Sequence, residues 1–178
     1  MMKKLMILLF AVALFPFNFS SCIDEGAEVL PEATMEGKNT FGCLVNGEVW
    51  LPKGYNGTPN LNLSYDPGYD NGTVDLRSYR IYSSESGDSE YVILYINNIS
   101  DVGTFHFSDT AHTEVVFYGR KNSCEYRSRS STTFNTGNIT ITRFDLKNQI
   151  ISGTFEFSLA KPGCDTIKVT QGRFDMKI

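Results

Sequence analysis

The chain has 178 residues, with 20 Asp and Glu against 16 Lys and Arg, which gives a formal net charge of −4 at pH 7. A chain with this acidic balance lacks the positive surface that attracts nucleic acids, so a nucleic-acid partner is not expected. The length suits a single domain that is large enough to bury a substantial core.

The first 21 residues have the layout of a secretory signal peptide. Lys3 and Lys4 precede an uninterrupted apolar run at residues 5–15, and small residues lead up to position 21. A charged start, a short apolar run and a small-residue end are typical of such signals. A transmembrane helix needs about 20 apolar residues, so this run is too short to be one. The alternative is a short helix buried in a core.

The residues at the end of this signal, 20–22, are Ser-Ser-Cys and resemble the lipobox of bacterial lipoproteins, with Phe19 where that family usually has Leu. The resemblance implies that the signal is removed before Cys22 and that the Cys22 thiol carries a diacylglycerol. It therefore implies a protein anchored in the bacterial outer membrane by its lipid. Several acyl chains hold a protein firmly, because each buried CH₂ contributes about 0.8 kcal/mol.

Residues 22–40 are predicted to form a flexible acidic tether. They contain five carboxylates, a single lysine and few large apolar side chains. Such a segment buries too little apolar surface to offset the entropy that ordering would cost. The pair Asp24 and Glu25 also resembles the acidic export signal of surface-exposed lipoproteins of Bacteroides-type bacteria, which implies exposure at the cell surface. The alternative is a plain solvated linker.

Residues 41–178 are predicted to form one all-β domain. Alternating apolar, β-branched and aromatic residues recur there without a sustained helical period. Asn46-Gly47 predicts a tight hairpin turn. About ten short strands indicate an antiparallel two-sheet β-sandwich or a partly closed barrel. Strands are expected near residues 41–45, 49–51, 73–83, 91–96, 103–107, 114–118, 139–144, 151–159 and 166–178.

Two details of this pattern go beyond simple alternation. The apolar phase changes between Ile141 and Phe144 and again at Gly172, which predicts bulges or strand breaks at both places. The pattern Gly-Thr-Phe-x-Phe-Ser occurs at residues 103–108 and again at 153–158. Both copies are predicted to be core strands that place their Phe side chains on one face.

Four stretches together resemble a family of uncharacterised Bacteroidota lipoproteins. They are residues 39–47 with Trp50, residues 137–145, residues 150–157 and residues 172–175. The resemblance covers most of the chain after Cys22. It implies a lipid-anchored β domain and brings no assigned activity.

Three cysteines remain once Cys22 is assigned to the lipid. Cys43 alternates with apolar neighbours and is expected to be a buried thiol, whereas Cys124 and Cys164 each lie beside a loop. In the oxidising cell envelope we expect these two to form a disulfide; the alternative is two free thiols. No Cys-x-x-Cys or Cys/His cluster points to a zinc site.

Four aromatic residues are the candidates for ligand stacking: Trp50, Tyr55, Tyr65 and Tyr69. They lie among Asn, Gly and Pro residues, where exposed rings on the rim of a sandwich would stack on sugar rings. The alternative is that these rings cap the ends of the core.

A weaker candidate is a calcium loop formed by Asp66, Asp70 and Asp75. Calcium binds oxygen ligands of this kind, but the spacing differs from that of an EF-hand loop. Asp, Asn and Gly are also the ordinary residues of a hairpin loop.

The sequence contains no catalytic signature. It has two histidines, no Gly-x-Ser-x-Gly motif and no phosphate-binding glycine loop. We therefore expect a non-enzymatic binding or structural lipoprotein without a cofactor, whose partners are the membrane and a glycan or protein ligand. The alternatives are a glycan-binding accessory protein in polysaccharide capture and a hydrolase whose site residues are scattered along the chain.

Overall fold

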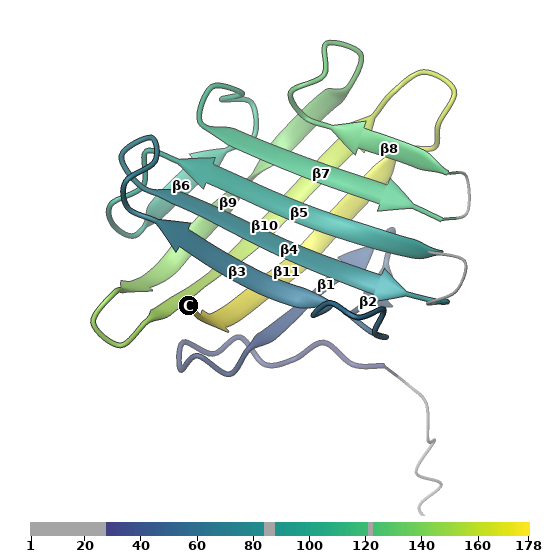
Figure 1. Ribbon diagram of the computed structural model, residues 1–178. Coiled ribbons are helices and arrows are strands. Elements are labelled where there is room, and N and C mark those ends of the chain that lie inside the picture. The colour runs from purple at the N-terminus through teal and green to yellow at the C-terminus, as the bar shows by residue number, and fades with distance from the viewer. Residues whose placement is uncertain (1–27, 84–87, 121–122) are drawn as a thin grey trace, which may run out of the picture.

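The computed structural model describes residues 28–83, 88–120 and 123–178. This part of the chain forms eleven strands in two antiparallel sheets and contains no helix, so the all-β prediction is confirmed. The two sheets face one another as an open sandwich and do not close into a barrel (Figure 1). The strands are β1 (Thr40–Val45), β2 (Glu48–Trp50), β3 (Leu61–Asp66), β4 (Thr73–Ile81), β5 (Ser89–Asn97), β6 (Gly103–His106), β7 (Thr113–Gly119), β8 (Cys124–Arg127), β9 (Phe134–Asp145), β10 (Ile150–Ala160) and β11 (Ile167–Lys177).

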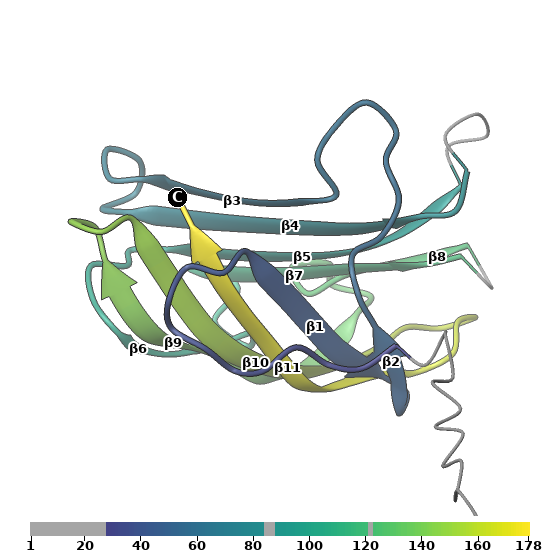
Figure 2. The same cartoon turned by 90° about the horizontal axis from the view of Figure 1, so that it is seen from below.

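The two sheets differ in the order of their strands. The six-stranded sheet has the order β2-β1-β11-β10-β9-β6, and the five-stranded sheet has the order β3-β4-β5-β7-β8. The five-stranded sheet is therefore built from the central part of the sequence, where only β6 crosses over to the other sheet. Figure 2 shows the two layers edge on, with β3 of one sheet and β1 of the other at the same side of the sandwich.

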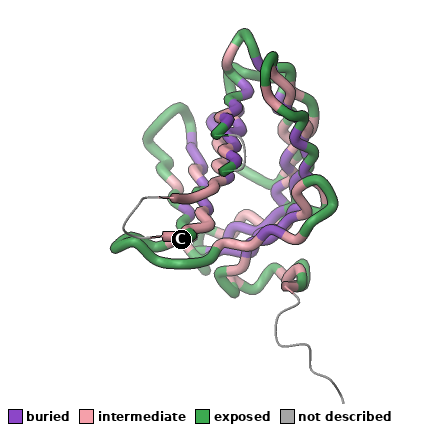
Figure 3. The backbone as a smooth tube through the Cα atoms, turned by 90° about the vertical axis from the view of Figure 1, so that its right-hand side faces the viewer, coloured by how far each residue is buried: buried purple, intermediate pink, exposed green. Residues whose placement is uncertain are grey.

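The core fills the space between the sheets. Alternate residues of each strand point inward, and Figure 3 shows buried segments along the strands and exposed segments in the loops. Burial of these apolar side chains is the main favourable term in folding. The largest fully buried apolar side chains include Leu76, Leu94, Ile96, Phe107, Ile139, Ile141, Ile151, Leu159 and Phe174.

A disulfide joins the two layers. Cys124 at the start of β8 is bonded to Cys164 in the connection between β10 and β11, which confirms the predicted pair. The third thiol, Cys43, is buried, and desolvation raises its pKa to about 12. It therefore stays protonated and unreactive at neutral pH.

Both predicted irregularities in the strands are confirmed as shifts of register. Between β9 and β10 the pairing skips Thr142, and between β10 and β11 it slips just before Gly172. Gly172 is required there because a Cβ atom would lie 2.5 Å from the ring of Phe155. A bulge at this point bends β11 and lets its two halves present apolar residues with opposite parity.

The two Gly-Thr-Phe stretches occupy equivalent positions on either side of β9. Gly103 of β6 and Gly153 of β10 both pair with Ile141, and Phe105 and Phe155 both pair with Ile139. Phe105 packs against the core and Phe155 lies inside it. Both copies are therefore core strands, as predicted, and their shared sequence fits one neighbour in the same register.

Residues 28–38, which we call the N-terminal strap, run along the domain in an extended path before β1. Glu28 pairs with Arg80 at 2.7 Å, Arg173 donates to the Pro31 carbonyl, and Thr34 donates to Asp175. Over residues 28–38 the structure therefore differs from the flexible tether expected for residues 22–40, of which residues 22–27 lie outside the described residues. Hydrogen bonds to distant residues hold the strap in place, and Leu30 and Pro31 are its half-buried apolar side chains.

The predicted signal peptide at residues 1–21, Cys22 and the pair Asp24 and Glu25 lie outside the described residues. Within the part of the chain that the structure covers, no helix has the length and apolar character required to cross a membrane.

Candidate functional site

The four aromatic residues predicted to stack on a ligand do not form a common platform. Trp50 is only 4 % exposed; its indole N–H donates to Glu90 Oε2 at 3.2 Å, and its ring packs on the core. Tyr65 packs edge to face against Phe144 at 5.2 Å. These two rings therefore belong to the core, as in the alternative interpretation.

Tyr55 and Tyr69 are the two exposed members of the set, at 68 % and 56 % exposure. Tyr55 lies in the connection from β2 to β3, and Tyr69 lies in the turn from β3 to β4. These two segments are at opposite ends of β3 (Figure 2). Two rings separated by a whole strand do not bind one sugar together, so the predicted stacking site is not assembled.

The predicted calcium loop is not assembled either, because its three carboxylates have separate partners. Asp66 accepts from the Gly68 N–H at 2.8 Å, Asp70 accepts from the Asn97 side chain at 3.0 Å, and Asp75 pairs with Arg77. Across residues 28–83, 88–120 and 123–178, no three His, Cys, Asp or Glu side chains are grouped to hold a metal ion. The aspartates instead stabilise the turn and the adjacent strand.

The outer face of the five-stranded sheet carries a row of tyrosines that the sequence analysis did not single out. Tyr79, Tyr91 and Tyr118 are direct cross-strand neighbours on β4, β5 and β7. Their ring centroids are 5.8 and 5.3 Å apart, and the planes of Tyr91 and Tyr118 are stacked at 18°. These cross-strand ring contacts stabilise the sheet, and the stacked faces of Tyr91 and Tyr118 cover one another.

Tyr91, the middle ring of this row, makes a partly buried polar contact with Glu125. The Tyr91 hydroxyl donates to a carboxylate oxygen of Glu125, and Glu125 also pairs with Arg127. Burial, together with the hydrogen bond to Glu125, raises the pKa of Tyr91 above its ordinary value. Tyr91 therefore remains protonated and acts as a donor within the sheet.

A small cavity of about 230 Å³ beside Trp50 contains two carboxylates, Glu48 and Glu90. Glu90 accepts hydrogen bonds from Trp50, from the Tyr82 hydroxyl at 2.9 Å and from the backbone N–H of Arg120. Both of its oxygens are thus engaged by the protein. This arrangement holds the ends of the two sheets together and leaves Glu90 poorly placed as an acid or a base for a substrate.

A hollow lies along one side of the sandwich, and we call it the edge groove. Its volume is about 580 Å³. It is bordered by the strap, the start of β1, the residues after β2, strand β3 and the end of β11. Figure 2 shows these segments along one side of the sandwich. The lining residues are Val29, Leu30, Pro31, Asn39, Thr40, Phe41, Leu51, Pro52, Asn60, Leu61, Asn62, Leu63, Met176 and Lys177.

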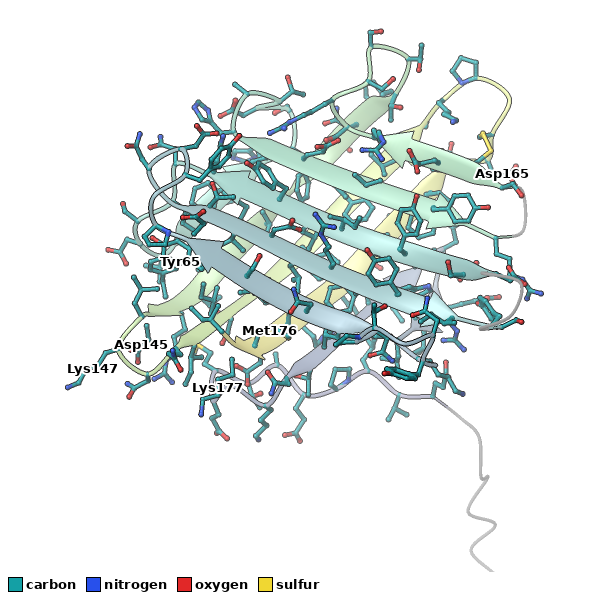
Figure 4. All side chains as sticks on the ribbon, in the orientation of Figure 1. Tyr65, Asp145, Lys147, Asp165, Met176 and Lys177 are labelled. Atoms are coloured by element: carbon teal, nitrogen blue, oxygen red, sulfur yellow. A yellow bond between two sulfur atoms is a disulfide. The ribbon has the colours of Figure 1, made fainter. Side chains whose placement is uncertain are left out.

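The edge groove has an apolar floor and a polar rim. Phe41, Leu63 and Met176 are buried at its base, at 3 %, 6 % and 3 % exposure. Its rim carries the amide side chains of three asparagines, at positions 39, 60 and 62. Lys177, beside Met176 at the end of β11 (Figure 4), is the one ionisable side chain in the lining. Such a surface favours binding of an apolar ligand that also makes hydrogen bonds.

The sequence explains why the groove exists at this position. β2 ends at Trp50, two residues before Pro52, which has no N–H with which to extend a ladder. β2 therefore pairs only with residues 43–45 of β1, and residues 40–42 have a neighbouring strand on one side alone. Gly42 lets the strap approach closely, because a Cβ atom there would lie 2.7 Å from Pro31.

The groove residues were not predicted as a site. Leu61, Leu63 and Tyr65 of β3 alternate with polar residues, which is a strand signal, but the segment is flanked by Asn, Gly and Pro residues typical of loops. The strap was assigned to a tether. The remaining lining comes from segments far apart in the sequence, and only the fold brings them together.

Comparison with known proteins gives one match. A family model described as "Domain of unknown function (DUF6252)" matches residues 54–176, which span β3 to β11 up to its penultimate residue. The strap, β1 and β2 precede the matched region. No curated protein and no solved structure matches the chain.

Proposed function

The chain belongs to the DUF6252 family, and we propose that it is a lipid-anchored, non-enzymatic binding protein of the bacterial outer membrane, exposed at the cell surface. In this proposal the lipid on Cys22 holds the protein at the membrane, and the edge groove holds a ligand. The β domain supplies a rigid frame for that groove.

The edge groove is the observation that carries the binding role. It combines a volume of about 580 Å³, a floor of buried apolar side chains and a rim of amides, which is the usual composition of a ligand site. Its lining contains no carboxylate, histidine, cysteine or serine that would serve as a nucleophile or general base. This composition supports binding without catalysis.

The position of the strap supports the anchoring role. Its first described residue, Glu28, is six residues after Cys22 and is fixed to the domain by Arg80. Six extended residues span at most about 20 Å. A lipid on Cys22 would therefore hold the domain close to the membrane surface, with limited freedom to move away from it.

Anchoring is tested by Cys22→Ala in the native host. We expect the variant to lose labelling by an azido fatty acid and to leave the membrane fraction. The double variant Asp24→Asn with Glu25→Gln is the control for surface export: we expect it to stay membrane-bound but to become inaccessible to protease added to intact cells. A Cys22→Ala protein that is still lipid-labelled and membrane-bound would refute the anchor.

Binding in the groove is tested by a photo-crosslinking amino acid at Asn62, on the groove rim, in intact cells. Thr104, on the distant edge strand β6, is the matched control position. We expect one recurring adduct at position 62 and none at position 104, and mass spectrometry then reports whether it is peptide, lipid or glycan. Equal labelling at both positions, or none at either, would show that the groove is not the binding site.

A further inference from the structure

The four edge strands of the two sheets are protected very unequally. β2 has three residues, β6 has four, and β8 has four that include Glu125 and Arg127. Short and charged edge strands are common ways in which proteins prevent pairing with another chain. β3 has six residues, Leu-Asn-Leu-Ser-Tyr-Asp, with no Lys, Pro or bulge along its length. It is therefore the edge of this sandwich best suited to accept another strand.

The hydrogen bonds of β3 show which of its backbone groups face the open side. The carbonyl of Asn60 accepts from the Tyr79 N–H at 2.7 Å, and β3 pairs with β4 in a regular antiparallel register. Since hydrogen-bonded and non-bonded pairs alternate in such a ladder, the backbone groups of Leu61, Leu63 and Tyr65 are directed away from β4. Those of Leu61 and Leu63 border the groove, and those of Tyr65 continue the same edge beyond it.

We propose that the edge groove binds an extended polypeptide segment of a partner protein, which adds a strand to the open edge of β3. This inference rests on the groove being the binding site, as proposed above, and names its ligand. Backbone hydrogen bonds to Leu61, Leu63 and Tyr65 supply the main contact, and pockets for alternate side chains supply selectivity. The edge from residue 61 to 65 accommodates about five residues of ligand at ~3.4 Å per residue.

The groove also specifies the side chains of the segment. On one face of the added strand, every second side chain points to the floor formed by Phe41, Leu63 and Met176, so those positions are apolar. Asn39 accepts a hydrogen bond from the Lys177 N–H, and Asn60 donates one to the Gly54 carbonyl, so the Asn62 amide is the rim group assigned to the peptide backbone or its polar side chains. Because Lys177 is the single charged group of the lining, a segment with a carboxylate near the end of β11 is favoured over a basic one.

A second copy of this chain fits the groove less well than a separate segment. If the β3 strands of two copies paired, the inward side chains of the added strand would already be packed in their own core, as Leu63 is here. The hollow of about 580 Å³ would remain unfilled. A segment that brings its own unburied apolar side chains fills it, which is why we assign the groove to a peptide.

The experiment uses the full-length protein purified in detergent and a random library of 12-residue peptides. Selected peptides are synthesised with N-methyl groups at each position in turn. We expect methylation at every second position of the central segment to weaken binding at least tenfold, and methylation at the intervening positions to change it less than twofold. Leu61→Pro, which removes one edge N–H, weakens binding at least tenfold, while Ser64→Ala on the outer face of β3 has no effect.

A second measurement requires no variant, so it remains informative if Leu61→Pro perturbs the fold. Bound peptide slows hydrogen exchange of the Leu61, Leu63 and Tyr65 amides at least tenfold. Absence of binders, methylation effects without alternation, or unchanged exchange of these amides would overturn the proposal. Sedimentation without peptide tests for self-association of the protein. If the protein self-associates and the same amides are protected, the edge of β3 binds a second copy of the chain instead. If the crosslink at Asn62 is specific to the groove but no peptide binds by the alternating pattern, the groove is still the binding site and its ligand does not add a strand to β3.

Discussion

The carboxylate of Asp175 accepts a hydrogen bond of 2.6 Å from the hydroxyl of Thr34, across 141 residues of chain. It also accepts from the backbone N–H groups of Glu36 and Gly37 and from the hydroxyl of Ser152. Asp175 lies on β11, yet it is only 1 % exposed because the strap covers it. This one side chain therefore joins the strap to the sheet.

Asp175→Asn is expected to lower the free energy of unfolding by about 2–4 kcal/mol, because a charged acceptor of several hydrogen bonds becomes a neutral one. Urea denaturation at pH 7 measures the change. Thr34→Val is the matched control: it removes one donor and leaves the carboxylate in place, so it should cost about 1 kcal/mol. Equal losses in the two variants would contradict the central role of Asp175.

The stability of the protein should also depend on the ionisation of Asp175. Burial by itself raises the pKa of this carboxyl, but the hydrogen bonds from Thr34, Ser152, Glu36 and Gly37 outweigh it and hold the pKa well below its usual range. The contribution is therefore complete above the unfolded-state value of about 3.9 and is lost as the pH falls through the lower folded-state pKa. Denaturation at pH 7, 4, 3 and 2 should show the gap between wild type and Asp175→Asn closing only in the acid range.

The disulfide between Cys124 and Cys164 closes a loop with a sequence separation of 40 residues and links β8 to the opposite sheet. On the chain-entropy model its removal costs about 4 kcal/mol. The variant with both cysteines changed to Ala should therefore unfold at a lower urea concentration than wild type. Adding a reductant should destabilise the wild-type protein and should leave the stability of the double variant unchanged. A variant as stable as the oxidised protein would show that the bond adds nothing to the fold.

Gly172→Ala is expected to lower the free energy of unfolding by ~1–3 kcal/mol, the usual range for overpacking a core. The new Cβ atom would lie 2.5 Å from Phe155, which is buried and cannot move aside. Gly68→Ala is the control, because its Cβ atom would meet only the Asp66 side chain at 3.4 Å in an exposed turn. Thermal unfolding of both variants separates the effect of the bulge from a general effect of adding a methyl group.

Arg80→Ala should loosen the start of the strap while changing global stability by no more than about 1 kcal/mol, as for most partly exposed ion pairs. Arg80 holds Glu28 through two hydrogen bonds, of 2.7 and 3.1 Å. Hydrogen exchange of the Val29 and Leu30 amides should become faster. Lys53→Ala is the control, since Lys53 makes one contact with Glu28 and is 66 % exposed. Similar exchange in both variants would mean that Arg80 does not fix the strap.

Local sequence patterns were sufficient to predict the sandwich and the bulges, whereas the disulfide was predicted only after the lipobox resemblance had assigned Cys22 to the lipid. The phase change around Thr142, the glycine at position 172 and the hairpin at Asn46-Gly47 each act on their immediate neighbours. Two strands were not predicted, β3 and β8, and both lie at the edge of the five-stranded sheet. Edge strands are short and polar on one face, so their composition is close to that of a loop.

The features that depend on distant residues could not be predicted in this way. Nothing near Asp175 in the sequence shows that its donors lie about 140 positions away, so the strap appeared to be a free tether. Trp50 stands among loop residues, yet its hydrogen bond to Glu90 and its contact with Phe41 place it in the core. The edge groove combines five separate segments. Only the paired sheets bring these segments together.

The strap also determines how the protein carries a mechanical load. In a molecule tethered through its first residues, tension enters at Glu28 and meets Arg80, then Arg173 at Pro31, then Asp175 at residues 34–37. Each of these attachments must rupture before the force reaches β1. In a molecule tethered in this way, the strap would bear the tension before β1 and would protect the first strand from being pulled out of the sandwich.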